Sequence, residues 1–149
     1  MPDRPPARTF FQQFLLYWLP VLLYVTVILT LSAQPHLQPP LHFRNADKLC
    51  HLIEYGGLGV LLARALRGSM RVSVPLFAGL MAIGLGSMIG AGDEYFQSFV
   101  PGRESSVFDW MADTLGVIVA QVAYVVGTRR MTRTARDTRH APGEERAWR

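Results

Sequence analysis

Long stretches without a charged residue dominate the pattern of this sequence. Residues 14–32 give 19 consecutive positions without a charge, and residues 72–92 give 21 more. A helix needs about 20 apolar residues to cross the hydrocarbon layer of a bilayer, and the cores of soluble proteins rarely contain such runs. Residues 49–66 form a weaker apolar segment interrupted by His51 and Glu54, and residues 107–127 form a fourth segment with Asp109 and Asp113 in its first two turns. The pattern predicts an all-α protein whose four helices span a membrane as a bundle.

The first apolar segment can be interpreted as a cleaved signal peptide or as a permanent membrane anchor. Its apolar run is longer than the roughly 7–15 residues of a signal sequence, and Leu31 is too large for the position three before a cut at Ala33. We therefore expect an uncleaved span. Tyr17 and Trp18 should lie at the membrane interface, and Pro20 should fall in the first turns of the span or kink it.

Length and composition limit the class of protein further. The chain has 149 residues, which allows one domain, and 50% of them are hydrophobic while 17% are charged. The single cysteine, Cys50, excludes an internal disulfide and a cysteine-rich metal site. A soluble enzyme and a disordered chain do not fit this pattern. We divide the chain into a cytoplasmic N-terminal segment (1–13), a transmembrane domain (14–127) and a basic cytoplasmic tail without regular structure (128–149).

The basic residues lie mostly on one side of the predicted bundle. If both termini share a side, that side holds 12 of the 15 Lys and Arg residues but only four of the 11 acids. Its net charge is then +8 and that of the opposite side −4. The positive-inside rule places both termini in the cytoplasm, as parts of a multi-pass protein of the cell membrane. Because the positive charges flank apolar spans, we expect membrane lipids and no nucleic acid as partners.

The remaining ionisable residues gather at the outer ends of the predicted spans. At about 100° per residue, Asp47, His51 and Tyr55 share one stripe of a helix with Glu54. Charged groups are costly within a span and normally face the bundle interior, where they pair. We expect a polar cluster, open to the outside, between the second, third and fourth spans, with the first span as a purely hydrophobic anchor. The candidate site consists of Asp47, Lys48, His51, Glu54, Tyr55, Asp93, Glu94, Gln97, Arg103, Asp109 and Asp113.

Three blocks of polar residues occur in a fixed order in this region. They begin at Asp47, Asp93 and Ser106, and they read D-K-x-x-H-x-x-x-Y-x-x-L-G, D-E-x-x-Q-x-F-x-P-G-R and S-x-x-D-x-x-x-D-x-x-G. Together they resemble the VanZ-like family of small bacterial integral membrane proteins, over residues 12–127. That family is named for a protein that accompanies glycopeptide-resistance genes and lowers sensitivity to teicoplanin. Many members have Asn where Asp113 stands here, so the resemblance does not imply a shared role for a negative charge at this position.

Several functions are consistent with the cluster. We expect it to bind or modulate a cell-envelope component, such as a lipid-linked or glycopeptide-like molecule, without catalysis and without a cofactor or metal. The alternative is a metal-assisted membrane hydrolase or transferase acting on a lipid phosphate, with His51 as acid or base. Its divalent ion would be held by Asp47, Glu54, Asp93 or Asp109. A third interpretation gives the cluster no role beyond assembling the helices.

Two side chains have a structural and a functional interpretation side by side. His51 can donate a hydrogen bond to Asp47 or Glu54 and fix helix packing, or it can serve as a metal ligand or proton relay. Arg103 can neutralise Asp109 or Asp113 in a salt bridge, or it can hold a phosphate or carboxylate group through its guanidinium fork. The sequence alone does not decide between these interpretations.

Overall fold

Each of the four predicted spans forms a helix. The computed structural model describes residues 8–36, 43, 45–69 and 75–140. Its long apolar helices confirm the all-α, four-span fold, because each is long enough to cross a bilayer. Their bounds as spans are Phe10–Ser32, Ala46–Ser69, Leu76–Gln97 and Val107–Arg130.

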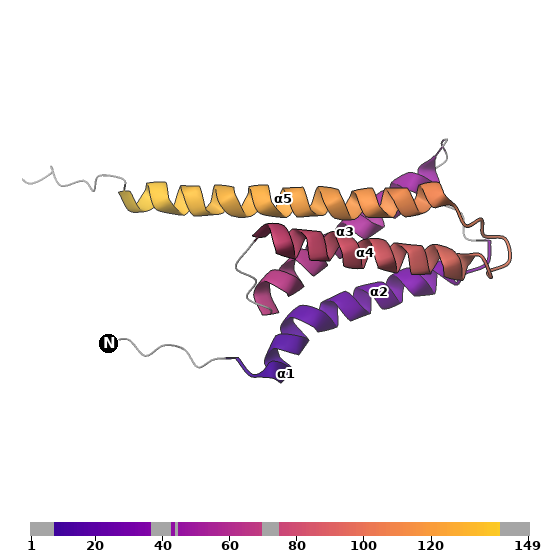
Figure 1. The fold of residues 1–149 in the computed structure, drawn as a ribbon, viewed down its shortest axis with the longest axis horizontal. Helices are drawn as coiled ribbons and strands as arrows, with labels where there is room; N and C mark the ends of the chain where they lie inside the picture. Colours follow the sequence, from indigo (N-terminus) through magenta and orange to yellow (C-terminus); the bar gives the residue numbers. More distant parts are fainter. Residues whose placement is uncertain (1–7, 37–42, 44, 70–74, 141–149) are drawn as a thin grey trace, which may run out of the picture.

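The first span is one continuous helix with a wide turn near its start. It comprises α1 (Phe10–Gln13), a π-helical turn η1 (Phe14–Trp18) and α2 (Leu19–Ser32). The backbone N–H of Leu19 bonds to the carbonyl of Phe14, five residues back. Pro20 has no N–H to offer the preceding turn, and a π-type turn is a common way for a helix to absorb such a defect. Figure 1 shows the bend between α1 and α2 at this point.

The other helices extend beyond the predicted spans. Helix α3 (Ala46–Ser69) begins and ends three residues outside the predicted 49–66, so it includes the polar residues at both of its ends. Helix α4 (Pro75–Gln97) continues five residues past Gly92, so the acids expected after the span lie in its last turns. Residues 72–74 of the predicted third span lie outside the described part of the chain.

Helix α5 (Val107–His140) corrects the prediction for the C-terminal region. The sequence indicated that the helix ends near Gly127 and that a tail without regular structure follows, but the helix continues to His140. Residues 128–140 are rich in Arg and Thr and contain neither Gly nor Pro, so nothing in them terminates a helix. Residues 141–149 of the predicted tail, like residues 1–7 of the predicted N-terminal segment, are outside the described residues.

The helices pack in a bundle with a small interior and an apolar exterior. Helix α3 crosses behind α4 and α5 in Figure 1 and packs mainly on α5. The buried core is lined by aliphatic and aromatic side chains, among them Tyr55, Leu58, Leu62, Leu66 and Val117. Large apolar side chains such as Leu23, Phe77 and Val122 are more than half exposed. An apolar exterior is what a bundle immersed in lipid requires, so the packing agrees with four membrane spans.

Candidate functional site

His51 of α3 and Asp113 of α5 form the buried centre of the site. Nδ1 of His51 lies 2.9 Å from Oδ1 of Asp113, and the Asp113 side chain is completely buried. Gly90 of α4 makes room for this pair, because a Cβ there would lie 2.9 Å from Oδ2 of Asp113 and 3.3 Å from the ring of Tyr55. Within the described part of the chain, neither Oδ2 of Asp113 nor the buried hydroxyl of Tyr55 has a hydrogen-bond partner. The centre therefore holds polar atoms whose bonding capacity is unused.

Lys48 connects α3 to α5 at the outer edge of this centre. Its Nζ donates hydrogen bonds to Oδ1 of Asp109 at 2.8 Å and to Oδ2 of Asp47 at 2.9 Å. The side chain of Asp109 is only 8% exposed, whereas that of Asp47 is 48% exposed. Lys48 therefore joins a buried carboxylate to one that reaches the surface.

Glu94 brings the end of α4 to the same centre. Its Oε2 accepts a hydrogen bond of 2.8 Å from the backbone N–H of Ser106, just before α5 begins. Its Oε1 lies 3.9 Å from Nδ1 of His51 and has no hydrogen-bond partner. One ligand-type atom each from His51, Glu94 and Asp109 lie within 4.8 Å of one another. Three helices thus contribute one donor or acceptor each to a single small volume.

A second group of polar side chains joins α2 to α4. Oδ2 of Asp93 accepts hydrogen bonds from Oγ of Ser32 at 2.9 Å and from Nε2 of Gln97 at 3.1 Å. Oε1 of Gln97 in turn accepts a hydrogen bond of 3.0 Å from a guanidinium nitrogen of Arg103. Oδ1 of Asp93 is buried without a partner. We call this group and the residues around His51 the polar cluster.

Comparison with known proteins agrees with the sequence blocks that form the polar cluster. Residues 7–128, most of the chain, match the model of the family described as VanZ/LLP1. The chain belongs to the VanZ/LLP1 family. Neither the curated proteins nor the solved structures contain a match to it. Family membership and the four apolar helices together make it a VanZ-like multi-pass membrane protein.

In this VanZ-like chain, His51 does not pair with the residues of its own helix that the structural interpretation named. His51 bonds to Asp113 across the helix interface and not to Asp47 or Glu54 on its own helix. Glu54 is half-buried, and its carboxylate makes no hydrogen bond or ion pair within the described residues; only its backbone carbonyl accepts one, from the hydroxyl of Tyr24. The reason is geometric. Helix α3 lies close to α5, so the side chain of His51 points toward Asp113 on the facing helix and not along its own helix toward Asp47 or Glu54.

For Arg103, the structural interpretation named a salt bridge to Asp109 or Asp113. Among the described residues the salt bridge to Asp109 comes from Lys48, and Arg103 bonds to Gln97. Lys48 lies on the helix that packs against α5, whereas Arg103 lies in the connection that follows α4. Lys48 is therefore the residue that forms the ion pair with Asp109.

The polar cluster of this VanZ-like protein is closed, where the sequence predicted an opening to the outside. The acids at its centre are 0–6% exposed and His51 is 9% exposed. Among the described residues around His51, only Asp47 and Lys48 reach the surface. Access to the centre from the described surface therefore passes these two side chains.

Ser32 is a member of the cluster that the sequence did not indicate. It lies at the end of α2 and is 4% exposed, with its hydroxyl between Asp93 and Gln97. The first span is therefore more than a hydrophobic anchor. A serine at the end of an apolar helix is common, and no spacing within that span distinguished it. Only the position of Asp93 opposite the end of α2 shows its role.

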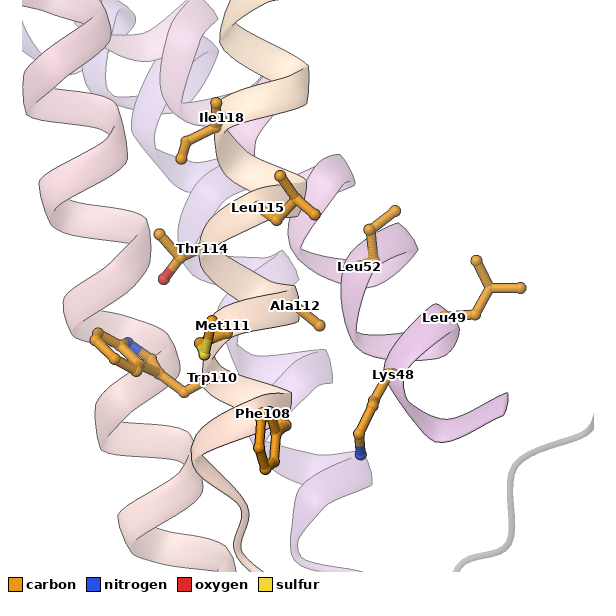
Figure 2. Close-up of a pocket in the computed structure, with 10 residues that line it drawn as sticks. All are labelled: Lys48, Leu49, Leu52, Phe108, Trp110, Met111, Ala112, Thr114, Leu115 and Ile118. Atoms are coloured by element: carbon orange, nitrogen blue, oxygen red, sulfur yellow. The ribbon is translucent and has the colours of Figure 1, made fainter. Parts of the chain in front are cut away.

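An apolar groove begins beside the outer edge of the cluster. Figure 2 shows Lys48 and Phe108 at one end of it and Ile118 at the other, with Leu52 and Leu115 between them on α3 and α5. The groove has a volume of about 680 Å³. Lys48, which lines the groove, is the same residue that bonds to Asp109 and Asp47. A hydrocarbon chain in this groove would place its polar head at the entrance to the cluster.

Proposed function

We propose that this VanZ-like protein binds a lipid-linked component of the cell envelope at the external face of the cell membrane. The apolar chain of the ligand lies in the groove between α3 and α5, and its head group reaches Lys48 and Asp47. The observation that carries the proposal is the shared position of Lys48, which lines the groove and bonds to the buried Asp109. The proposal includes the link to teicoplanin-type glycopeptide resistance that family resemblance implies.

The chemistry of the cluster supports a head group that offers hydrogen-bond donors. Carboxylates dominate it, and ionised carboxylates only accept hydrogen bonds. A head group with several sugar hydroxyls or an ammonium group meets this demand, whereas a simple anionic phospholipid offers few hydrogen-bond donors. A lipid-linked saccharide therefore fits both the apolar groove and the acidic entrance.

Filling the groove should prevent binding of such a lipid. We expect Leu115→Trp to weaken binding of a polyprenyl-linked saccharide about tenfold or more, a loss of 1.4 kcal/mol, because the indole occupies the space of the lipid chain. Native mass spectrometry of the protein released from nanodiscs that contain this lipid and phosphatidylglycerol measures the bound fraction of each.

The matched control is Leu23→Trp, which alters a lipid-facing side chain of α2 that is 59% exposed and outside the groove. It should retain wild-type binding. Equal binding by Leu115→Trp and the wild type, or no preference of the wild type for the saccharide lipid over phosphatidylglycerol, would contradict the proposal.

The proposed external position of the cluster rests on the charge asymmetry of the chain. The start of α3, the end of α4 and the start of α5 lie at the end of the bundle opposite to α1 and the last turn of α5 (Figure 1), and these three helix ends carry Asp47, Asp93 and Asp109. Arg129 and Arg130 are the last residues of the fourth span, and Arg133 follows it within the described part of α5. Basic residues next to a span are retained in the cytoplasm, so the acidic end faces outward.

Reporter fusions test this orientation. A fluorescent protein fused after residue 149 should fold and fluoresce, and alkaline phosphatase at the same point should be inactive. Alkaline phosphatase fused after Gly102, in the connection between α4 and α5, should be active, because that connection lies at the acidic end. The reverse pattern of activities would place the cluster on the cytoplasmic side and remove this part of the proposal.

A further inference from the structure

We propose that the polar cluster holds one divalent transition-metal ion, ligated by His51, Glu94 and Asp109. A site of this kind goes beyond the lipid binding proposed above and does not depend on it. It also departs from the sequence-based expectation of a site without a metal. The sequence offered Asp47, Glu54 and Asp93 as candidate ligands with Asp109, and the structure selects a different set around the histidine.

The first observation is the convergence of three ligands from three helices. One ligand-type atom from each of His51, Glu94 and Asp109 lie within 4.8 Å of one another. Bonds from zinc to nitrogen and oxygen ligands are about 2.0–2.2 Å long, so ligand atoms around one ion lie somewhat closer together than this. Small movements of the carboxylate side chains bring all three atoms into contact with one ion.

The second observation is an unused, buried ligand atom beside the imidazole ring of His51. Among the described residues Oε1 of Glu94 has no hydrogen-bond partner; it lies 3.9 Å from Nδ1 of His51 and belongs to a side chain that is 8% exposed. The other oxygen of Glu94 is already fixed by the N–H of Ser106. A buried carboxylate oxygen without a donor is costly, and a cation removes that cost. The Glu94 side chain is therefore held in place with its free oxygen toward the histidine.

The third observation is the balance of charge in the cluster. Four buried carboxylates lie in it, from Asp93, Glu94, Asp109 and Asp113, and three of them have an oxygen without a hydrogen-bond partner. Lys48 bonds to Asp109 through Oδ1 alone, so Oδ2 is left for another ligand. Buried charges require counter-charges, and a divalent ion supplies two at the point where the carboxylates meet.

Asp113 would act as a positioning residue and not as one of the three ligands. Its Oδ1 lies 2.9 Å from Nδ1 of His51 and thereby fixes the orientation of the imidazole ring, which leaves Nε2 as the nitrogen that would bind the ion. Metal-binding histidines commonly have such a carboxylate partner, and loss of the partner typically weakens metal affinity by about 10–100-fold.

The donor set restricts the choice of metal. One imidazole nitrogen with two carboxylates suits Zn²⁺ and Mn²⁺, whereas Mg²⁺ and Ca²⁺ prefer ligand sets made only of oxygen. The described residues of the site contain no thiolate close to His51, Glu94 and Asp109, which excludes the soft ligand set preferred by Cu(I). We therefore expect Zn²⁺ to bind more tightly than Mg²⁺ or Ca²⁺.

Metal analysis of the purified full-length protein in detergent micelles tests the inference. After removal of metal with a chelator and addition of Zn²⁺, the wild type should bind a single ion per chain and unfold at a higher temperature. Glu94→Gln and the triple variant His51→Ala, Glu94→Gln, Asp109→Asn should lose the ion, and Asp113→Asn should bind it more weakly. Glu104→Gln, which alters an exposed acid before α5, should bind as the wild type does.

Specific outcomes would overturn the metal site. Wild-type protein that takes up no Zn²⁺ or Mn²⁺ and shows no thermal shift would contradict it, and so would Zn²⁺ bound equally well by the triple variant. Gel filtration and circular dichroism of each variant without metal show whether it folds, and the wild-type titration decides the question even if a variant does not. Lipid binding in nanodiscs is measured separately, so failure of one proposal leaves the other standing.

Discussion

Asp113→Ala should lower the free energy of unfolding by about 3–5 kcal/mol, the largest electrostatic effect expected in this protein. The Asp113 side chain is completely buried, and its Oδ1 lies 2.9 Å from Nδ1 of His51. Alanine removes the partner of a buried imidazole. It also leaves a void beside Gly90, where α4 approaches α5. Unfolding of the protein in detergent micelles with increasing sodium dodecyl sulfate, followed by circular dichroism with a chelator present, measures the change.

Asp113→Asn is the matched control for this prediction. The amide has nearly the same volume and retains an oxygen that accepts a hydrogen bond from the imidazole. Its loss of stability should therefore be less than half of that caused by alanine. A loss below about 1 kcal/mol for Asp113→Ala would show that the pair contributes little to the bundle.

Gly116→Val should destabilise the interface between α3 and α5 by about 3 kcal/mol or prevent the bundle from forming. A Cβ at Gly116 would collide with the backbone carbonyl oxygen of Leu52 and lie 2.9 Å from the backbone nitrogen of Gly56. Backbone atoms cannot move aside as a flexible side chain can, so the two helices would have to separate. Small residues permit this approach, which is the main source of contact between helices in a membrane.

Gly84→Ala serves as the comparison for the interface glycine. Gly84 lies on the exposed side of α4, and no atom lies within 4 Å of the position of a Cβ there. Alanine should be neutral or should raise stability by up to about 1 kcal/mol, because glycine is a poor residue in a helix interior. The same detergent titration compares both variants. Equal stability of Gly116→Val and the wild type would mean that α3 and α5 are not packed as closely as described.

The same approach of α3 to α5 explains why the polar cluster is compact. Gly59 continues the contact made by Gly116, since a Cβ there would lie 2.7 Å from Cβ of Ala120 and 2.9 Å from Cα of Val117. Toward the acidic end of the bundle, the interface changes from small apolar residues to His51 and Asp113. The close approach of the two helices lets these side chains meet directly, at 2.9 Å.

The polar residues of the site were visible in the sequence because of their spacing. His51 and Tyr55 are one helical turn apart, as are Asp109 and Asp113, and all four are buried in the structure. A charged residue within an apolar span indicates an interior position whatever its partner, because lipid does not solvate it. Which of these residues bond to one another could not be predicted, since that depends on how far each helix is rotated and shifted against its neighbours.

The packing of the glycines could likewise be predicted only in part. The sequence indicated that the glycine-rich third span packs closely, yet of its glycines only Gly86 and Gly90 lie where a Cβ would come within 3.0 Å of a neighbouring atom. Gly84 and Gly92 face open space, and the tightest backbone approach involves Gly116 of α5. A glycine permits a close approach of two helices. The number and spacing of glycines in a span do not say whether another helix lies on that side.

The sequence by itself determined four membrane spans and the level of the bundle at which the ionisable residues lie, because hydrophobic length and helical period are local properties of the chain. Tertiary structure alone decided that Lys48 pairs with Asp109, that Ser32 of the first span joins the cluster and that Glu94 faces His51. These contacts join residues far apart in the chain across separate helices. They follow from the crossing geometry of the helices, which depends on the packing of all four together.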